Sequence, residues 1–235
     1  MNKGNGKFII PPGVKPKAAI YLLESEFLLV AERAGKIEQK YVSPGVLRQA
    51  FSAEPIDSGW IPAGVRRWGV SVKGTWMLRW HAPALYPIWL PNRKRQVKVP
   101  FPGLIFFAQG SKYYIWATKG AAFDPKAKLW NAPCANVNSL GLICWGQNTH
   151  PDVATGCFEK MWATFWEAPF SPNWATGKSA AFANANNRLA DLAKRGATAY
   201  PEDDLTPLRH HLLPDPATLE AVVDRMVRRG DVEWA

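Results

Sequence analysis

The sequence predicts an α+β protein built on an antiparallel sheet, with its strands in the first half of the chain and its helices in the second. Short apolar or alternating runs, bounded by glycine and proline, recur between residues 18 and 118. Apolar residues then recur at helical spacing from Phe158 onward. Strands followed by helices, rather than alternating with them, favour an α+β meander over a parallel α/β sheet.

The clearest hairpin joins residues 104–108 to residues 113–118 through Gln109-Gly110-Ser111. A short helix is expected at 46–51, and the stretch 52–67 is rich in glycine, proline and serine, as a loop would be. We expect the strands to form a single sheet. The other strand candidates are 18–31 and 36–42, which form a pair, and then 68–73, 76–80 and 86–90.

Three helices are expected in the second half. The first contains Phe158, Met161, Trp162, Phe165 and Trp166 at i, i+3, i+4, i+7 and i+8, and it ends before Pro169. The second covers about 179–195, with Gly196 as its C-terminal signal. The third runs over 216–229, with Asp215 as N-cap and Pro216 as its first residue.

Length and composition indicate an ordinary globular protein. The chain has 235 residues, of which 47% are hydrophobic and 20% charged. No apolar run approaches the ~20 residues that cross a bilayer, and the first residues lack the apolar stretch of a secretory signal. Three cysteines are too few for a disulfide framework. We therefore expect a cytoplasmic protein without membrane association.

A net charge of +10 leaves the nature of the partner open. The favoured interpretation is a solvated surface, and the alternative is an acidic protein face or a nucleic acid. No helix-turn-helix, RNA-binding signature or zinc-finger spacing accompanies the basic residues. Nucleic-acid binding is therefore an alternative that no motif supports.

The segment from 120 to 150 has neither strand nor helix periodicity, and long irregular segments in compact domains are usually functional. It contains Asn136 and, eight residues later, Cys144, preceded by Gly141 and Ile143. A thiolate both attacks a carbonyl and leaves again readily, and a fixed amide N–H stabilises the oxyanion between those steps. The alternative for Cys144 is a small buried apolar residue, and the alternative for Asn136 is a turn cap.

This spacing resembles the active-site segment of ubiquitin-conjugating enzymes, although Cys134 and Ala135 stand where that family has His-Pro. Longer strings resemble the prokaryotic ubiquitin-conjugating-like family D, which includes protein B of PRTRC cassettes. The resemblance covers about 18–215. It implies a ubiquitin-conjugating-like domain over 18–215, between a tail at 1–17 and a C-terminal helix at 216–235. The strings that carry it are Pro102-Gly103-Leu104-Ile105-Phe106-Phe107, Tyr114-Ile115-Trp116-Ala117, Leu129-Trp130-Asn131-Ala132-Pro133 and Cys144-Trp145-Gly146.

The resemblance implies a carrier that accepts a ubiquitin-like protein as a thioester on Cys144 and transfers it to an amine. Asn136 would donate to the oxyanion, and Gly141 and Ile143 would support the approach to the thiol. Trp145 is expected in the core or against the modifier's tail. Asp152 is expected to cap a turn or to lower the proton affinity of the acceptor lysine. The expected partners are a ThiF-like activating enzyme, the modifier and a JAB-type metalloprotease; no cofactor or metal is expected.

Three alternatives compete with this function. Cys134, Cys144, His150 and Cys157 have ligand chemistry for zinc, but they lack the tight Cys-x2–4-Cys spacing. A hydrolase would pair Cys144 with a histidine base, for which His150 is nearest in sequence. The missing His-Pro pair favours an inert adaptor of the same fold in a plasmid- or defence-associated complex, whereas the retained cysteine favours the carrier.

Overall fold

The computed structural model describes residues 18–228, except for 24–25, 34, 52–61, 72, 92–94, 171–172, 212 and 214. The expected tail at 1–17, most of the expected loop at 52–67 and the end of the chain from 229 lie outside the described residues. The chain forms two compact units, Met1–Trp60 and Ile61–Ala235. The boundary between these units lies at residue 60, whereas the boundaries expected from the sequence lie at 17 and 215. The extent of the ubiquitin-conjugating-like domain over 18–215 stays a prediction.

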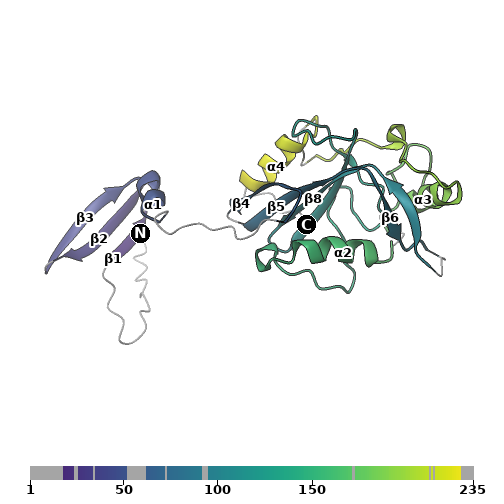
Figure 1. Cartoon of the computed structure of the whole chain (residues 1–235). Coiled ribbons are helices and arrows are strands. Elements are labelled where there is room, and N and C mark those ends of the chain that lie inside the picture. Colours follow the sequence, from purple (N-terminus) through teal and green to yellow (C-terminus); the bar gives the residue numbers. More distant parts are fainter. Residues whose placement is uncertain are drawn as a thin grey trace, which may run out of the picture. The chain divides into compact units, whose positions relative to one another are not determined.

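The first unit contains a three-stranded antiparallel sheet followed by a short helix (Figure 1). Its strands are β1 (Ala18–Leu22), β2 (Phe27–Arg33) and β3 (Lys36–Val42), and its helix is α1 (Pro44–Phe51). The expected strand pair is thus three strands, because the first apolar run is divided between β1, which ends at Leu22, and β2, which begins at Phe27. Every residue of β1 is exposed, and Ile37 and Tyr41 on β3 are exposed as well.

The second unit is organised by a five-stranded antiparallel sheet in the order β10-β9-β8-β5-β4. Its central hairpin, β8 (Gly103–Gln109) and β9 (Lys112–Thr118), is the one expected from the sequence. The expectation of a single sheet is wrong, because β6 and β7 pair only with each other. Pro83 and Pro102 lie at the ends that connect this pair to β5 and β8, and proline donates no ladder hydrogen bond. The remaining strands are β4 (Val65–Ser71), β5 (Gly74–His81), β6 (Ala84–Ile88), β7 (Val97–Phe101) and β10 (Trp130–Asn131).

Side chains of β8 and β9 alternate between two cores, one on each face of the sheet. Phe106 and Ile115 enter the first core, while Phe107 and Trp116 enter the second. Both faces are buried because helices cover them: α2 (Phe158–Glu167) packs in the first core and α4 (Leu219–Arg228) in the second, on opposite sides of the sheet (Figure 1). Within the described residues, no helix is both long enough and apolar enough to cross a membrane.

The first expected helix is confirmed as α2, whereas the other two are shorter than expected. The second, α3 (Ala185–Lys194), begins at an N-cap formed by Asn184, whose side chain accepts from the N–H of Asn186. The expected N-cap at Asp215 is wrong, because α4 begins only at Leu219. In both cases the residues before the helix bind distant segments instead of continuing the helix. Before α4, Ala217 and Thr218 pair with the backbone of 128–129, and before α3, Ser179 and Ala181 bind Asp204.

Asp204 explains why α3 begins late. Its carboxylate is buried and accepts hydrogen bonds from the Ser179 hydroxyl at 2.7 Å, the Ala181 N–H at 2.9 Å, Nε of Arg188 at 3.1 Å and the Tyr200 hydroxyl at 2.7 Å. The segment before α3 is therefore held by Asp204, which ends a 3₁₀ turn at Glu202–Asp204. Burial alone would raise the pKa of Asp204, but these hydrogen bonds and Arg188 hold that pKa below its usual value.

Replacing this carboxylate is expected to destabilise the second unit. Asp204→Asn removes the buried charge partner of Arg188 and leaves it the partly exposed Asp191 at 3.3 Å, which we expect to cost roughly 3 kcal/mol of unfolding free energy. Since the pKa of Asp204 is lower in the folded state than in the unfolded chain, its ionised carboxylate contributes to the folding stability at every pH above the unfolded pKa. This contribution is lost as pH falls below about 4, through the folded value.

Urea unfolding of both proteins at neutral and acid pH measures this effect. The gap between parent and Asp204→Asn should be large at about pH 7 and shrink in acid. The control is Asp203→Asn. The Asp203 carboxylate is fully exposed and its ion pair with Lys119 is long, at 4.0 Å, so this substitution should not change the unfolding free energy measurably. Equal losses for the two variants would contradict the network's role.

Candidate active site

Cys144 lies at the end of a backbone hairpin that spans residues 136–144. Its N–H donates to the carbonyl oxygen of Asn136 at 2.8 Å, and Val137 pairs with Ile143 as an antiparallel bridge. The N–H of Asn138 continues the pairing by donating to the carbonyl oxygen of Leu142 at 2.9 Å. These bonds close the eight-residue interval seen in the sequence, so the backbones of Asn136 and Cys144 are direct neighbours.

The turn of this hairpin is made by Asn138 and Gly141. Oδ1 of Asn138 accepts from the N–H groups of Leu140 and Leu142, each at 2.9 Å. Gly141 has a φ of 90°, a conformation that side chains disfavour, and a Cβ there would lie 2.1 Å from Nε1 of Trp116. That indole N–H donates to the Leu140 carbonyl oxygen at 2.8 Å. Glycine at 141 therefore allows the turn to rest on Trp116.

The hairpin also extends the five-stranded sheet. Leu142 forms an antiparallel bridge with Tyr114 on β9, and the N–H of Ile143 donates to the Tyr113 carbonyl oxygen at 2.9 Å. On the other side of the bridge, the N–H of Ile115 donates to the Gly141 carbonyl oxygen at 2.8 Å. The cysteine-bearing segment is thus irregular in sequence yet bound along the edge of β9.

Pairing with β9 determines which side chains are buried. Ile143 and Trp145 both enter the first core, and the Trp145 indole meets the Tyr113 ring edge to face with centroids 5.5 Å apart. Successive side chains of an extended segment point in opposite directions, so Cys144 between them points away from this core. Its thiol is exposed. Trp145 is only 7% exposed, which places its indole among the core residues.

Asn136 differs from a turn-capping asparagine. Its side chain is buried, with 4% exposure, and Oδ1 has no hydrogen-bond partner among the described residues. Asn138 caps the turn instead. Buried polar atoms are nearly always paired, so an unpaired Oδ1 on a residue whose backbone binds that of Cys144 is a feature that function can explain.

Four consecutive buried residues, 134–137, lead into and begin the hairpin, and the carbonyl group of each accepts a hydrogen bond. The carbonyl oxygen of Ala135 accepts from the Trp174 N–H at 3.2 Å, and that of Asn136 accepts from Cys144. Those of Cys134 and Val137 both accept from Nζ of Lys178, the first at 2.6 Å. Lys178 is 4% exposed, and burial lowers its pKa to about 8. Sequence reasoning missed Lys178 because its partners are backbone atoms far away in the chain.

The other residues considered from the sequence have structural contacts. Asp152 caps a 3₁₀ turn at Val153–Thr155, where its Oδ1 accepts from the Ala154 N–H at 2.8 Å. His150 lies with Nδ1 3.1 Å from the Ser111 carbonyl oxygen, and Cys157 lies with Sγ 3.0 Å from the Tyr113 hydroxyl. The part of the chain that the structure describes brings no three metal-ligating side chains together, so nothing in its geometry supports the zinc alternative.

Cys134 is a core residue. It is fully buried, and burial raises the pKa of its thiol to about 12. At neutral pH this thiol is therefore protonated and out of reach of a protein substrate. Of the three cysteines, Cys144 alone is exposed, whereas Cys157 is half-buried.

One known protein family matches most of the chain. The model of prokaryotic E2 family D matches residues 40–208, which is more than half of the chain. The chain belongs to this family. The match includes the whole hairpin, the β8–β9 pair and Lys178, and it begins within β3 of the first unit. Comparison with curated proteins found no match, and neither did comparison with solved structures.

Gly141→Ala should destabilise the hairpin more than an alanine at another left-handed glycine. It adds a clash with Trp116 to the cost of a positive φ, so we expect a loss of roughly 2–4 kcal/mol. Gly146→Ala is the matched control, because Gly146 also has a positive φ but its Cβ would meet nothing within 4 Å. Urea unfolding followed by tryptophan fluorescence compares them. Equal losses would show that contact with Trp116 is unimportant.

Proposed function

We propose that the chain is a carrier that holds a ubiquitin-like protein as a thioester on Cys144 and passes it to an amine. Membership of prokaryotic E2 family D supports ubiquitin-like conjugation as the general function. The observation that carries the finer proposal is the exposed Cys144, whose backbone pairs directly with that of Asn136, a buried residue whose Oδ1 has no hydrogen-bond partner among the described residues. The proposed fold is accordingly a ubiquitin-conjugating-like domain in which this hairpin is the cysteine-bearing flap.

The proposed reaction has two acyl transfers. In the first, Sγ of Cys144 attacks the activated C-terminal carbonyl of the modifier; the new C–S bond forms as the activating enzyme's leaving group departs. In the second, an amine attacks the thioester carbonyl, a C–N bond forms, the C–S bond breaks, and the amine loses a proton to solvent. Cysteine suits both steps because its thiolate is a good nucleophile and a good leaving group.

Each transfer passes through a tetrahedral oxyanion, for which Asn136 is the proposed donor. The donating atom would be Nδ2. The side chain is buried and its Oδ1 accepts no hydrogen bond among the described residues, so a turn does not fix its orientation. A donor of this kind typically contributes ~2.7–4 kcal/mol to catalysis. Gly141 and Ile143 are proposed to hold the hairpin in place, Gly141 against Trp116 and Ile143 in the core. Trp145 and Asp152 are assigned supporting structural roles.

The proposed partners are a ThiF-like activating enzyme, the ubiquitin-like modifier and a JAB-type metalloprotease of the same system. The family supports the first two in general terms, and the proposed compartment is the cytoplasm. ATP is consumed by the activating enzyme, so the carrier itself requires no cofactor for the transfer.

Cys144→Ser is expected to replace a thiol-labile adduct with a slower, thiol-resistant oxyester or with none. The assay combines the chain with its activating enzyme, modifier and ATP, and compares gels with and without reductant. Cys157→Ser is the control, because Cys157 is the other cysteine with some solvent exposure and it lies against Tyr113 rather than in the hairpin. It should retain a thiol-labile adduct.

Two outcomes would contradict the proposal. A thiol-labile adduct on Cys144→Ser would show that another residue is the nucleophile. Failure of the parent to accept modifier from an activating enzyme that charges itself normally would favour the inert adaptor.

A further inference from the structure

Lys178 is a buried cation whose described partners are backbone carbonyl groups rather than carboxylates. Its Nζ donates to the carbonyl oxygens of Cys134 and Val137, and these two residues flank Asn136. No ion pair of Lys178 occurs among the residues that the structure describes. The carboxylate of Asp204 accepts from Ser179, the residue after Lys178, and it is further occupied by Arg188 and Tyr200.

None of the titratable groups Cys134, Tyr200, Asp204 and Arg188 balances the charge of Lys178. The thiol of Cys134 is neutral at physiological pH because burial raises its pKa to about 12. Burial also raises the pKa of Tyr200, so its hydroxyl is neutral as well, and the charges of Asp204 and Arg188 compensate each other. The ammonium group is therefore stabilised mainly by the two carbonyl dipoles.

A buried ammonium costs folding free energy that an apolar side chain of similar length would not. The depressed pKa of Lys178 expresses this cost: the folded protein prefers the neutral amine relative to the unfolded chain. Its two hydrogen bonds, however, satisfy two of the four carbonyl groups of segment 134–137. The lysine thus fixes the backbone on both sides of Asn136 at the expense of stability.

We propose that Lys178 is a positioning residue, whose charged ammonium group clamps segment 134–137 and thereby keeps Asn136 aligned with Cys144. The clamp acts through backbone atoms and makes no contact with the reacting groups. Its catalytic consequence rests on the proposed function, whereas its structural consequence for the hairpin does not.

The clamp has a defined pH dependence. The pKa of Lys178 is about 8 in the folded protein, against an ordinary value of 10.5. Between these values the unfolded chain binds more protons, so stability gains from Lys178 as pH rises through this window. The charge-assisted hydrogen bonds weaken over the same window, because the amine is losing its charge. As pH rises through this window, the folding stability should therefore increase while the hold of Lys178 on segment 134–137 weakens.

The first test uses the parent protein and needs no activity. In NMR spectra of protein labelled at lysine Cε, the Lys178 signal should titrate near pH 8. The backbone amide signals of Asn138 and Cys144 should shift with the same midpoint, because the first belongs to the Val137 peptide group and the second donates to Asn136. Amide signals that show no inflection at the Lys178 midpoint would overturn the proposal.

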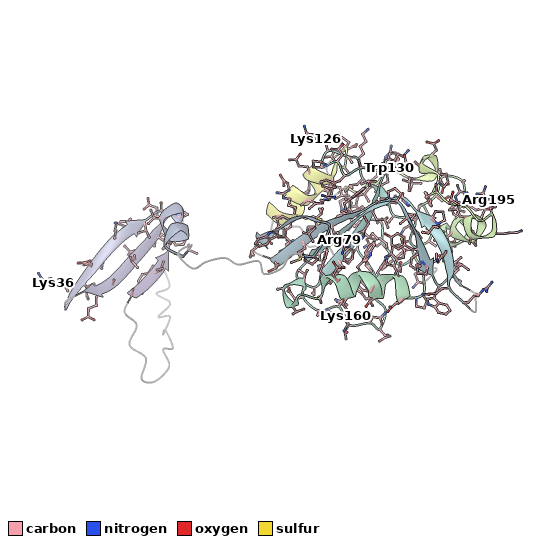
Figure 2. The ribbon with its side chains drawn as sticks, viewed as in Figure 1. Lys36, Arg79, Lys126, Trp130, Lys160 and Arg195 are labelled. Carbon is pink, nitrogen blue, oxygen red and sulfur yellow. The ribbon has the colours of Figure 1, made fainter. Side chains whose placement is uncertain are left out.

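The second test compares Lys178→Met with Lys160→Met. Methionine keeps the length of the side chain but removes the charge and the donors. Lys160 is an exposed lysine on the outer side of α2, labelled in Figure 2, and its replacement should have no effect. In Lys178→Met we expect hydrogen exchange at the Cys144 and Gly141 amides to rise about tenfold or more, while exchange in β8 stays as in the parent. Unchanged exchange across 136–144 would overturn the proposal.

The catalytic half is tested by the ratio of charging rates of parent and Lys178→Met as a function of pH. The ratio cancels every pH effect on the charging rate that both proteins share. It should be roughly tenfold to a hundredfold near pH 7 and fall toward one above about pH 9, as the parent loses the charge of Lys178. A ratio that does not vary with pH would reduce Lys178 to a packing residue. An uncharged parent would instead contradict the proposed function, and the NMR and exchange results would still decide the clamp.

Discussion

The candidate site depends on the backbone pairing of residues 136–138 with residues 142–144. This pairing gives the Cys144 N–H a partner in the Asn136 carbonyl group, and it aligns the hairpin with β9 through Tyr113 and Tyr114. Because β9 is buried on both faces, the hairpin rests on one of the most fixed parts of the second unit. The thiol is thereby exposed on a rigid sheet edge, and rigid elements hold reacting groups more accurately than free loops do.

Two buried charged groups, Asp204 and Lys178, hold backbone segments of the second unit in place, but they differ in what they cost. The Asp204 carboxylate accepts from four donors, and one of them, Arg188, carries the opposite charge. This network therefore stabilises the fold. Lys178 has carbonyl groups in place of a carboxylate, so its charge is costly. Stability alone explains the first group and leaves the second unexplained. A need to hold the residues beside Asn136 in one arrangement explains Lys178.

Local patterns predicted the parts of the fold where one period dominates. The hairpin of β8 and β9 and the stripe from Phe158 to Trp166 were visible because their apolar spacing is strong. The start of α3 was not visible, because it is set by contacts of Asp204 with residues distant in the chain. At the site, spacing predicted that Asn136 and Cys144 belong together. The turn cap at Asn138 and the clamp at Lys178 left no sequence signal, since their partners are backbone atoms.

The central claim is that the modifier is carried on Cys144. The most direct measurement is peptide mapping by mass spectrometry of the parent after charging by its activating enzyme, with digestion at mildly acid pH to preserve thioesters. The account predicts the C-terminal carboxyl group of the modifier on the peptide that contains Cys144, and release of that adduct by added thiol. The modifier attached to Cys157 or Cys134, or directly to a lysine without passing through Cys144, would contradict it.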